Sequence, residues 1–221
     1  MRYKVLVMDH DDTAVNSTRR IHFPAYLDVM SRLRPREPLL DLNGFFQRNF
    51  DPGYVEYLEN ELGMSREEVD EEYRVWHSYT ATRISEFYPG MLDFLERFLA
   101  SGGYLAVVSH SVQDSIERDY RHADREGVRP HLIYGWDQEP HKRKPAPFPV
   151  EDARRRLGVD HEEILVVDDL KPGVVMARRA GVAVAGAGWG HNVAEIREYM
   201  QEHCDYFLET VQELAELVLE T

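Results

Sequence analysis

The sequence predicts a three-layer α/β fold with a mainly parallel sheet, into which an all-helical domain is inserted. Short, continuous apolar runs are typical of parallel strands that are buried on both faces. Such runs occur at residues 5–8, 105–108, 132–134, 164–167 and 182–185. Helical patterns lie between and beside the later runs, and this alternation of strand and helix favours a three-layer arrangement.

Amphipathic segments in the second half of the chain predict the helices of the outer layers. Residues 91–100 place leucine and phenylalanine side chains on one face, which is the pattern of a helix packed on a sheet. Ser111 is placed to cap a helix that runs on through Ile116, and residues 174–180 predict another helix.

The segment between the first two apolar runs breaks this rhythm. Residues 16–86 carry aromatic and leucine side chains at helical spacing and contain no strand pattern. We therefore predict a core domain formed by residues 1–15 and 87–221, and a helical cap domain formed by residues 16–86.

One helix of the predicted cap has a clear start signal. Ser65 followed by Glu68 is a capping-box pattern, which opens many helices. Tyr73, Trp76 and Tyr79 follow at helical spacing, and we expect this stripe to face the interior of the cap.

Composition excludes several classes of function. The 221-residue chain has a net charge of −14 and no basic stripe, so binding to nucleic acid or to an anionic membrane is not expected. No apolar stretch approaches the ~20 residues needed to span a bilayer. The chain has one cysteine, Cys204, and no signal-peptide pattern at its start, and both observations favour the cytoplasm.

Polar clusters lie at or just beyond the carboxyl ends of the predicted strands, or in the loops beside them. They are Asp9-His10-Asp11-Asp12-Thr13, Ser109-His110-Ser111, Lys144 and Asp168-Asp169. In open α/β sheets this edge is where ligands bind. Alternation along the strand end turns Asp9 and Asp11 the same way, so that two carboxylates face one substrate.

These residue types together suit phosphoryl transfer. The reaction needs an anionic nucleophile, a proton donor for the leaving oxygen, a divalent cation, and cationic and hydroxyl groups that hold the phosphoryl oxygens. Several carboxylates around one point favour a hard cation with oxygen ligands, and Mg²⁺ is the expected cofactor.

The same residues carry a family resemblance. The sequence resembles the haloacid dehalogenase superfamily of phosphohydrolases, in the branch with a helical cap inserted into a Rossmann-like core after the first strand. Four motifs appear in the family's order, at Asp9–Thr13, Ser109, Lys144 and Asp168-Asp169. The turn at residues 87–90 and the Gly188-Trp189-Gly190 loop are similar to those of phosphoglycolate-phosphatase relatives.

The resemblance implies a role for each motif residue. Asp9 would be the nucleophile, and Asp11 the general acid that later activates water. Ser109 and Lys144 would bind the transferring phosphoryl group. Asp169 would ligate Mg²⁺ together with Asp9 and the main-chain carbonyl of Asp11.

Other positions near these motifs complete the predicted site. His110 follows the phosphate-binding serine and is a further candidate for contact with phosphate. Thr13 and Asp168 are expected to support the metal site without being ligands. For Asp168 the reason is that adjacent residues at a strand end point to opposite sides, and Asp169 takes the ligand position. The chain departs from the family pattern at Asp12, where glycine is common, and at Gly173, where a further aspartate is common.

The predicted function is a Mg²⁺-dependent phosphatase that hydrolyses a small phosphorylated metabolite through an aspartyl phosphate. Two alternatives stay open, a sugar-phosphate mutase of the same family and a catalytically silent phosphate-binding module. A response-regulator receiver is disfavoured, because its acidic pair precedes the phosphorylated aspartate in the chain. The sequence leaves the physiological substrate and the oligomeric state open.

Overall fold

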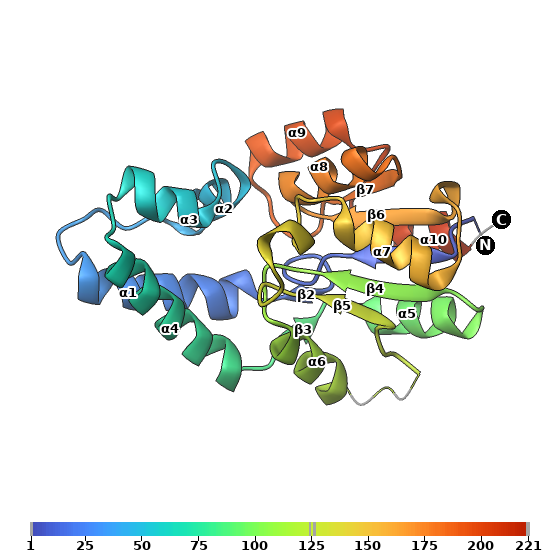
Figure 1. Cartoon of the computed structure of the whole chain (residues 1–221), viewed down its shortest axis with the longest axis horizontal. Coiled ribbons are helices and arrows are strands. Elements are labelled where there is room, and N and C mark those ends of the chain that lie inside the picture. Colours follow the sequence, from blue (N-terminus) through green and yellow to red (C-terminus); the bar gives the residue numbers. More distant parts are fainter. Residues whose placement is uncertain (1, 124, 126, 220–221) are drawn as a thin grey trace. The chain divides into compact units, whose positions relative to one another are not determined.

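The structure is a computed structural model that describes residues 2–123, 125 and 127–219 (Figure 1). The chain divides into two compact units. The core unit consists of Met1–Asn16 with Glu86–Thr221, and the helical unit consists of Ser17–Ser85. No helix in the described part of the chain is both long enough and apolar enough to cross a membrane.

A parallel sheet forms the centre of the core unit. The described residues build six strands in the order β5-β4-β1-β6-β7-β8, and every neighbouring pair is parallel. The strands are β1 (Val5–Met8), β4 (Tyr104–Val108), β5 (Leu132–Tyr134), β6 (Ile164–Asp168), β7 (Ala183–Ala187) and β8 (Tyr206–Leu208). The predicted parallel α/β sheet is therefore confirmed. The edge strand β8 was not predicted, because it is short and only its last residue is buried.

Helices cover both faces of this sheet (Figure 1). They are α5 (Met91–Ala100), α6 (Gln113–His122), α7 (Phe148–Leu157), α8 (Lys171–Ala180), α9 (Ala194–His203) and α10 (Val211–Leu219). Side chains of α5, α6 and α10 share one apolar cluster with Leu6 and Met8 of β1. The alternate residues Val5 and Val7 are equally buried but are not part of that cluster, as expected of a strand covered on both faces.

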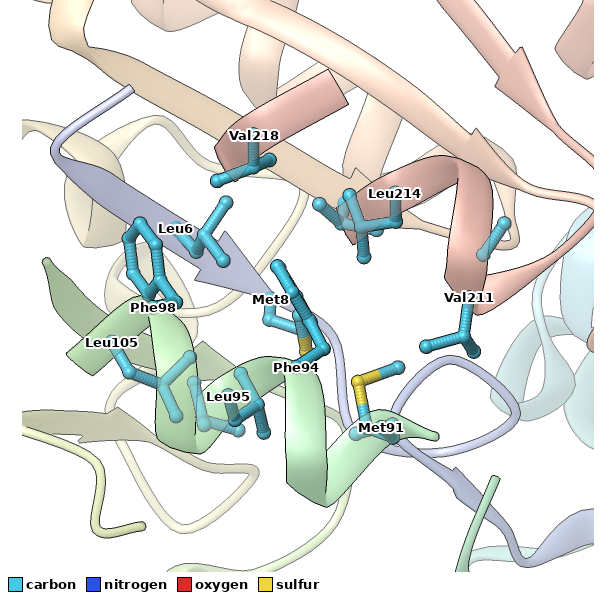
Figure 2. Packing of buried hydrophobic residues seen from close by; sticks show 14 of the residues in the cluster. Leu6, Met8, Met91, Phe94, Leu95, Phe98, Leu105, Val211, Leu214 and Val218 are labelled. Carbon is cyan, nitrogen blue, oxygen red and sulfur yellow. The ribbon is translucent and has the colours of Figure 1, made fainter. Parts of the chain in front are cut away.

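Figure 2 shows how α5 and α10 pack over β1. Phe94 and Phe98 of α5 lie beside Leu6 and Met8, and Leu214 of α10 completes the layer. All of these side chains are at most 2% exposed. This packing holds β1 rigidly in the middle of the sheet, and the residues that follow β1 therefore start from a fixed position.

One helix start differs from the prediction. Helix α6 begins at Gln113, and the residue before it, Val112, makes no side-chain cap. The expectation that Ser111 caps this helix is wrong. Its hydroxyl is instead hydrogen bonded to Asp11, a residue 100 positions earlier in the chain.

The helical unit has its own small core. Its helices are α1 (Phe23–Leu33), α2 (Leu42–Phe50), α3 (Tyr54–Glu56) and α4 (Arg66–Thr82), with single π-helical turns at Thr18–His22 and Tyr57–Glu61. The core cluster consists of Tyr26, Met30, Phe45, Tyr57, Leu58 and Met64. The predicted helical character of this inserted segment is confirmed.

Helix α4 begins as predicted but turns a different face to the interior. Both hydrogen bonds of the capping box between Ser65 and Glu68 are present. The expected burial of Tyr73 is wrong, because this side chain is 39% exposed. Glu72 and Val75 are buried in its place. The buried face of α4 therefore includes the acidic side chain of Glu72, whereas hydrophobic periodicity had predicted the aromatic side chain of Tyr73 there.

Strand order brings the polar clusters together. β1 lies between β4 and β6, and the three strands run in the same direction. Their carboxyl ends therefore lie at one edge of the sheet, where the order of strands along the chain reverses and where ligands bind in open α/β sheets. A two-stranded antiparallel ribbon, β2 (Val15–Asn16) with β3 (Glu86–Phe87), follows the first of these ends.

Candidate active site

Asp9 directly follows β1 and is the centre of the site. Its backbone N–H donates to Val167 O at 2.9 Å, which extends the pairing between β1 and β6 by one residue. The side chain is buried, and its two oxygens accept hydrogen bonds from Lys144 Nζ at 2.6 Å and from Thr13 Oγ1 at 3.2 Å. Burial raises the pKa of Asp9 well above its ordinary value, although the charge of Lys144 acts in the opposite direction.

Lys144 reaches this edge from the loop between β5 and α7. Its ammonium also donates to Asp168 Oδ2 at 2.8 Å, so one cation is shared between two buried carboxylates. Burial opposes the charge on Lys144, but Asp168 and Asp9 outweigh it and hold the pKa of Lys144 above its ordinary value. The ammonium therefore stays protonated and offsets part of the negative charge of the site.

Asp168 and Asp169 stand at the end of β6. One carboxylate oxygen from each of them and one from Asp9 lie within 4.8 Å of one another. We expected Asp168 to support the metal site without being a ligand, and its carboxylate lies in this group of oxygens while it also accepts a hydrogen bond from Lys144. The chain turns into α8 at this point, and Leu170 N donates to Asp168 Oδ1 at 2.9 Å, which turns the side chain back toward Lys144.

Gly173 explains the missing aspartate of the family pattern. A Cβ atom at this position would lie 2.2 Å from the carboxyl carbon of Asp168. That distance is far below van der Waals contact, so any side chain at position 173 would displace Asp168 from its present position. An aspartate at position 173 and the carboxylate of Asp168 in its present position therefore exclude each other.

The three aspartates fit a hard divalent cation. Carboxylate oxygens are the ligands that Mg²⁺ and Ca²⁺ bind in proteins. Asp169 Oδ2 is buried and accepts no hydrogen bond from the described residues, and an unsatisfied buried oxygen costs free energy unless it finds a partner. Burial raises the pKa of Asp169 well above its ordinary value, and Asp168 and Asp12 add to that rise. A bound cation would satisfy the oxygen and favour its ionised form.

Asp11 faces a different set of partners. Its Oδ2 accepts hydrogen bonds from Ser109 Oγ at 2.8 Å and from Ser111 Oγ at 2.7 Å. Both serines come from the loop after β4, and both are buried. The structure thus separates the two carboxylates of the first motif, with Asp9 beside the cationic lysine and Asp11 beside two hydroxyls.

The remaining predicted residues line the same edge of the sheet. The hydroxyl of Thr13 lies 3.2 Å from Asp9 Oδ2 and 3.3 Å from Asp169 Oδ1, and thereby bridges two members of the acidic group. His110 is exposed, and its Nε2 lies 3.2 Å from the backbone oxygen of Lys144. The structure therefore brings every predicted site residue to one edge of the core unit.

The loop from His10 to Val15 is bent tightly. Asp12 adopts a left-handed backbone conformation, with φ of 58°, which explains why glycine suits this position. Its N–H donates to Val15 O at 2.7 Å. Gly190 lies against Asp12, since a Cβ atom at position 190 would be 2.3 Å from the backbone oxygen of Asp12.

Sequence reasoning missed two histidine contacts beside the site. His191 Nε2 lies 3.4 Å from Asp169 O, and burial lowers the pKa of His191 to about 4, so the ring is neutral. His10 Nε2 lies 3.1 Å from a carboxylate oxygen of Asp119 on α6, and both side chains are buried. His191 follows the β7 strand end, so strand order was a usable signal for it. No sequence signal links His10 to Asp119.

Known proteins with similar sequences point to one class of enzyme. Pyrophosphatase PpaX of Bacillus velezensis is 24% identical over 220 residues, which cover 96% of this chain and 95% of that protein. Phosphoglycolate phosphatase of Haemophilus influenzae is 25% identical over 125 residues, which cover 57% of this chain and 55% of that protein. The prediction of a phosphatase-type hydrolase is in accord with both relatives and is confirmed.

Solved structures and the family comparison agree with this class. The crystal structure of a haloacid dehalogenase-like hydrolase from Bacteroides fragilis superposes with a TM-score of 0.81 at 20% identity, covering 96% of this chain and 99% of that one. This similarity supports the α/β fold with its helical insertion. The family model of haloacid dehalogenase-like hydrolases matches residues 6–187, which include the four motifs at Asp9–Thr13, Ser109, Lys144 and Asp168-Asp169. The chain therefore belongs to the haloacid dehalogenase-like hydrolase family.

Proposed function

We propose that the protein is a Mg²⁺-dependent phosphatase that hydrolyses a small phosphorylated metabolite through an aspartyl phosphate on Asp9. The observation that carries this proposal is the position of Asp9. Its carboxylate is ion-paired with the ammonium of Lys144, and one of its oxygens lies within 4.8 Å of an oxygen of Asp168 and an oxygen of Asp169. A nucleophile that must approach a phosphate dianion needs such a balance of fixed positive charge and cation ligands.

Each residue has a task in the first half of the reaction. One oxygen of Asp9 attacks phosphorus, and the bond between phosphorus and the leaving oxygen breaks. Asp11 gives a proton to that oxygen, so the alcohol leaves in neutral form. Lys144 and Ser109 hold the phosphoryl oxygens. A divalent cation bound by Asp9, Asp169 and the main-chain carbonyl of Asp11 would offset the charge that accumulates around the phosphoryl group.

The second half of the reaction returns the enzyme to its starting state. Asp11 takes a proton from water, whose oxygen attacks the phosphorus of the aspartyl phosphate. The bond between phosphorus and Asp9 then breaks, and inorganic phosphate leaves. Asp11 thus ends protonated again, with a proton from water in place of the one that left with the alcohol, and Asp9 is again a carboxylate.

Further features of the chain support the proposed domain organisation, substrate class and cellular compartment. Two compact units support the proposal of a core domain of residues 1–15 and 87–221 with a helical cap domain of residues 16–86. The curated relatives are named for a pyrophosphatase and a phosphoglycolate phosphatase, which supports a small phosphorylated substrate. The single free cysteine, Cys204, supports a reducing compartment, and we propose the cytoplasm.

Hydrolysis of p-nitrophenyl phosphate tests the proposal. We expect turnover with Mg²⁺, none with a chelator, and none in Asp9→Asn, because an amide is not a competent nucleophile. Asp160→Asn is the matched control, since Asp160 is exposed and precedes β6, at the opposite end of that strand from Asp168. Mass spectrometry of acid-quenched protein should locate one phosphoryl group on the peptide that contains Asp9. A correctly folded protein that turns over no member of a broad panel of phosphate esters would instead support the silent phosphate-binding module.

A further inference from the structure

Two serine hydroxyls hold the same oxygen of Asp11. Ser109 Oγ and Ser111 Oγ donate to Asp11 Oδ2 at 2.8 Å and 2.7 Å. The N–H of Ser111 in turn donates to Ser109 Oγ at 2.9 Å. The family resemblance assigns a task only to Ser109. Nothing in the helix that follows requires the hydroxyl of Ser111, because that hydroxyl does not cap α6.

The backbone around Ser111 is held in place on both sides. Ser109 N donates to Tyr134 O at 3.0 Å, and Trp136 N donates to Ser111 O at 2.9 Å. Gly135 allows this approach, since a Cβ there would lie 2.8 Å from Ser111 O. Ser111 is only 4% exposed, and its backbone is hydrogen bonded to the next loop. It therefore presents its hydroxyl to Asp11 from a fixed position.

Proton counting separates the tasks of the two serines. A serine hydroxyl has a single proton to donate. When Ser109 donates that proton to a phosphoryl oxygen, it no longer donates it to Asp11. Ser111 then remains the hydroxyl donor to Asp11 Oδ2 while the substrate is bound.

We propose that Ser111 is a positioning residue for proton transfer by Asp11. This inference rests on the proposed phosphatase activity. By holding Oδ2, Ser111 keeps Oδ1 as the oxygen that carries the proton to the leaving group. As the bond between phosphorus and the leaving oxygen breaks, the electron pair stays on that oxygen, and the proton moves to it from Oδ1. In the second half, water returns a proton to the same Oδ1 as its oxygen attacks phosphorus.

Leaving-group dependence in single-turnover phosphorylation tests the inference. Benzyl phosphate has a leaving oxygen that needs a proton, whereas p-nitrophenolate leaves without one. We expect Ser111→Ala to slow phosphorylation by benzyl phosphate by about 10- to 100-fold, as part of the ~10²–10⁴-fold that a positioned acid contributes. With p-nitrophenyl phosphate the rate should change little. Ser101→Ala, which removes an exposed hydroxyl bonded to Arg97 O, is the matched control.

A double-mutant cycle decides whether Ser111 acts through Asp11. In an Asp11→Asn background, adding Ser111→Ala should cause no further loss with benzyl phosphate, because the acid that it positions is already gone. With Asp11 intact, Ser111→Thr keeps the hydroxyl and should react with benzyl phosphate at a rate close to that of the wild type. Thermal unfolding of each variant controls for misfolding.

The outcomes distinguish this inference from the proposed function. Equal losses for both esters, or the same loss in the presence and absence of Asp11, would show that Ser111 supports phosphate binding or folding and would overturn the inference alone. Ser111→Ala that behaves as the wild type with benzyl phosphate would also overturn it. A wild-type protein that hydrolyses neither ester would remove the proposed function, and the positioning role with it.

Discussion

Lys144 Nζ lies 2.6 Å from a carboxylate oxygen of Asp9, in a buried ion pair that joins the loop before α7 to the end of β1. The same ammonium contacts Asp168. Removal of one partner from a buried ion pair leaves an uncompensated charge in a poorly solvated position. Lys144 is therefore expected to contribute both to folding and to the chemistry.

Lys144→Met should destabilise the protein by about 3 kcal/mol at neutral pH and abolish turnover, because two buried carboxylates lose their cation. Urea unfolding measures the first effect and initial rates the second. Lys142→Met is the control, since Lys142 makes a partly exposed ion pair with Glu139, and its loss should cost at most about 1 kcal/mol. Equal midpoints for Lys144→Met and the wild type would contradict this prediction.

Asp169 and Asp168 should differ in their effect on the metal requirement. Asp169 Oδ2 accepts no hydrogen bond from the described residues, whereas Asp168 is engaged by Lys144 and by Leu170 N. Asp169→Asn should raise the Mg²⁺ concentration for half-maximal rate by about 10- to 100-fold or more. Asp168→Asn should shift it less and mainly lower stability. Magnesium titrations of initial rates decide the matter, and a larger shift for Asp168→Asn would reverse the assignment.

Glu72 should make the stability of the helical unit depend on pH. Burial raises the pKa of Glu72 to about 7, against the opposing effects of Tyr54 and His22. Because the folded state holds the proton more tightly than the unfolded state, stability is highest at acidic pH and falls as pH rises from about 4.5 to about 7. The full loss above that window amounts to about 3 kcal/mol.

Unfolding measured from pH 5 to pH 8 tests this dependence. In Glu72→Gln the fall with pH should be clearly shallower than in the wild type, since the amide does not ionise and the contribution of Glu72 is lost. Glu59→Gln, on an exposed residue of the same unit, should leave the fall unchanged. If Glu72→Gln loses stability with rising pH as steeply as the wild type, another group is responsible.

Asp12 should tolerate glycine and reject a β-branched residue. Its φ of 58° lies in the left-handed region, where a β-branched side chain is strongly disfavoured. Asp12→Gly should alter stability by no more than about 1 kcal/mol, whereas Asp12→Val should cost at least about 1–2 kcal/mol. Thermal unfolding of the two variants makes the comparison. Similar losses for both would show that the carboxylate of Asp12, rather than its backbone conformation, matters.

The sequence by itself determined the sheet and the place of the site. The continuous apolar runs at residues 5–8 and 164–167 match buried parallel strands, because burial on both faces leaves no polar alternation. Since the carboxyl ends of parallel strands share an edge, the order of the motifs along the chain was enough to bring Asp9, Ser109 and Asp169 to one place. The capping box of Ser65 and Glu68 could also be predicted from the sequence, because it depends only on local spacing.

Tertiary structure decided how the side chains pair within that place. Local spacing assigned Ser111 to a helix cap, yet its hydroxyl binds Asp11, and the packed structure places Asp168 against Lys144 and beside Asp9 and Asp169. The position of Ser111 depends on a loop from another part of the chain, which approaches it at Gly135, and that of Asp168 depends on Gly173 of α8, which leaves room for the carboxylate. Hydrogen-bond partners are chosen by distances of a few tenths of an ångström, and such distances exist only once the loops are packed against one another.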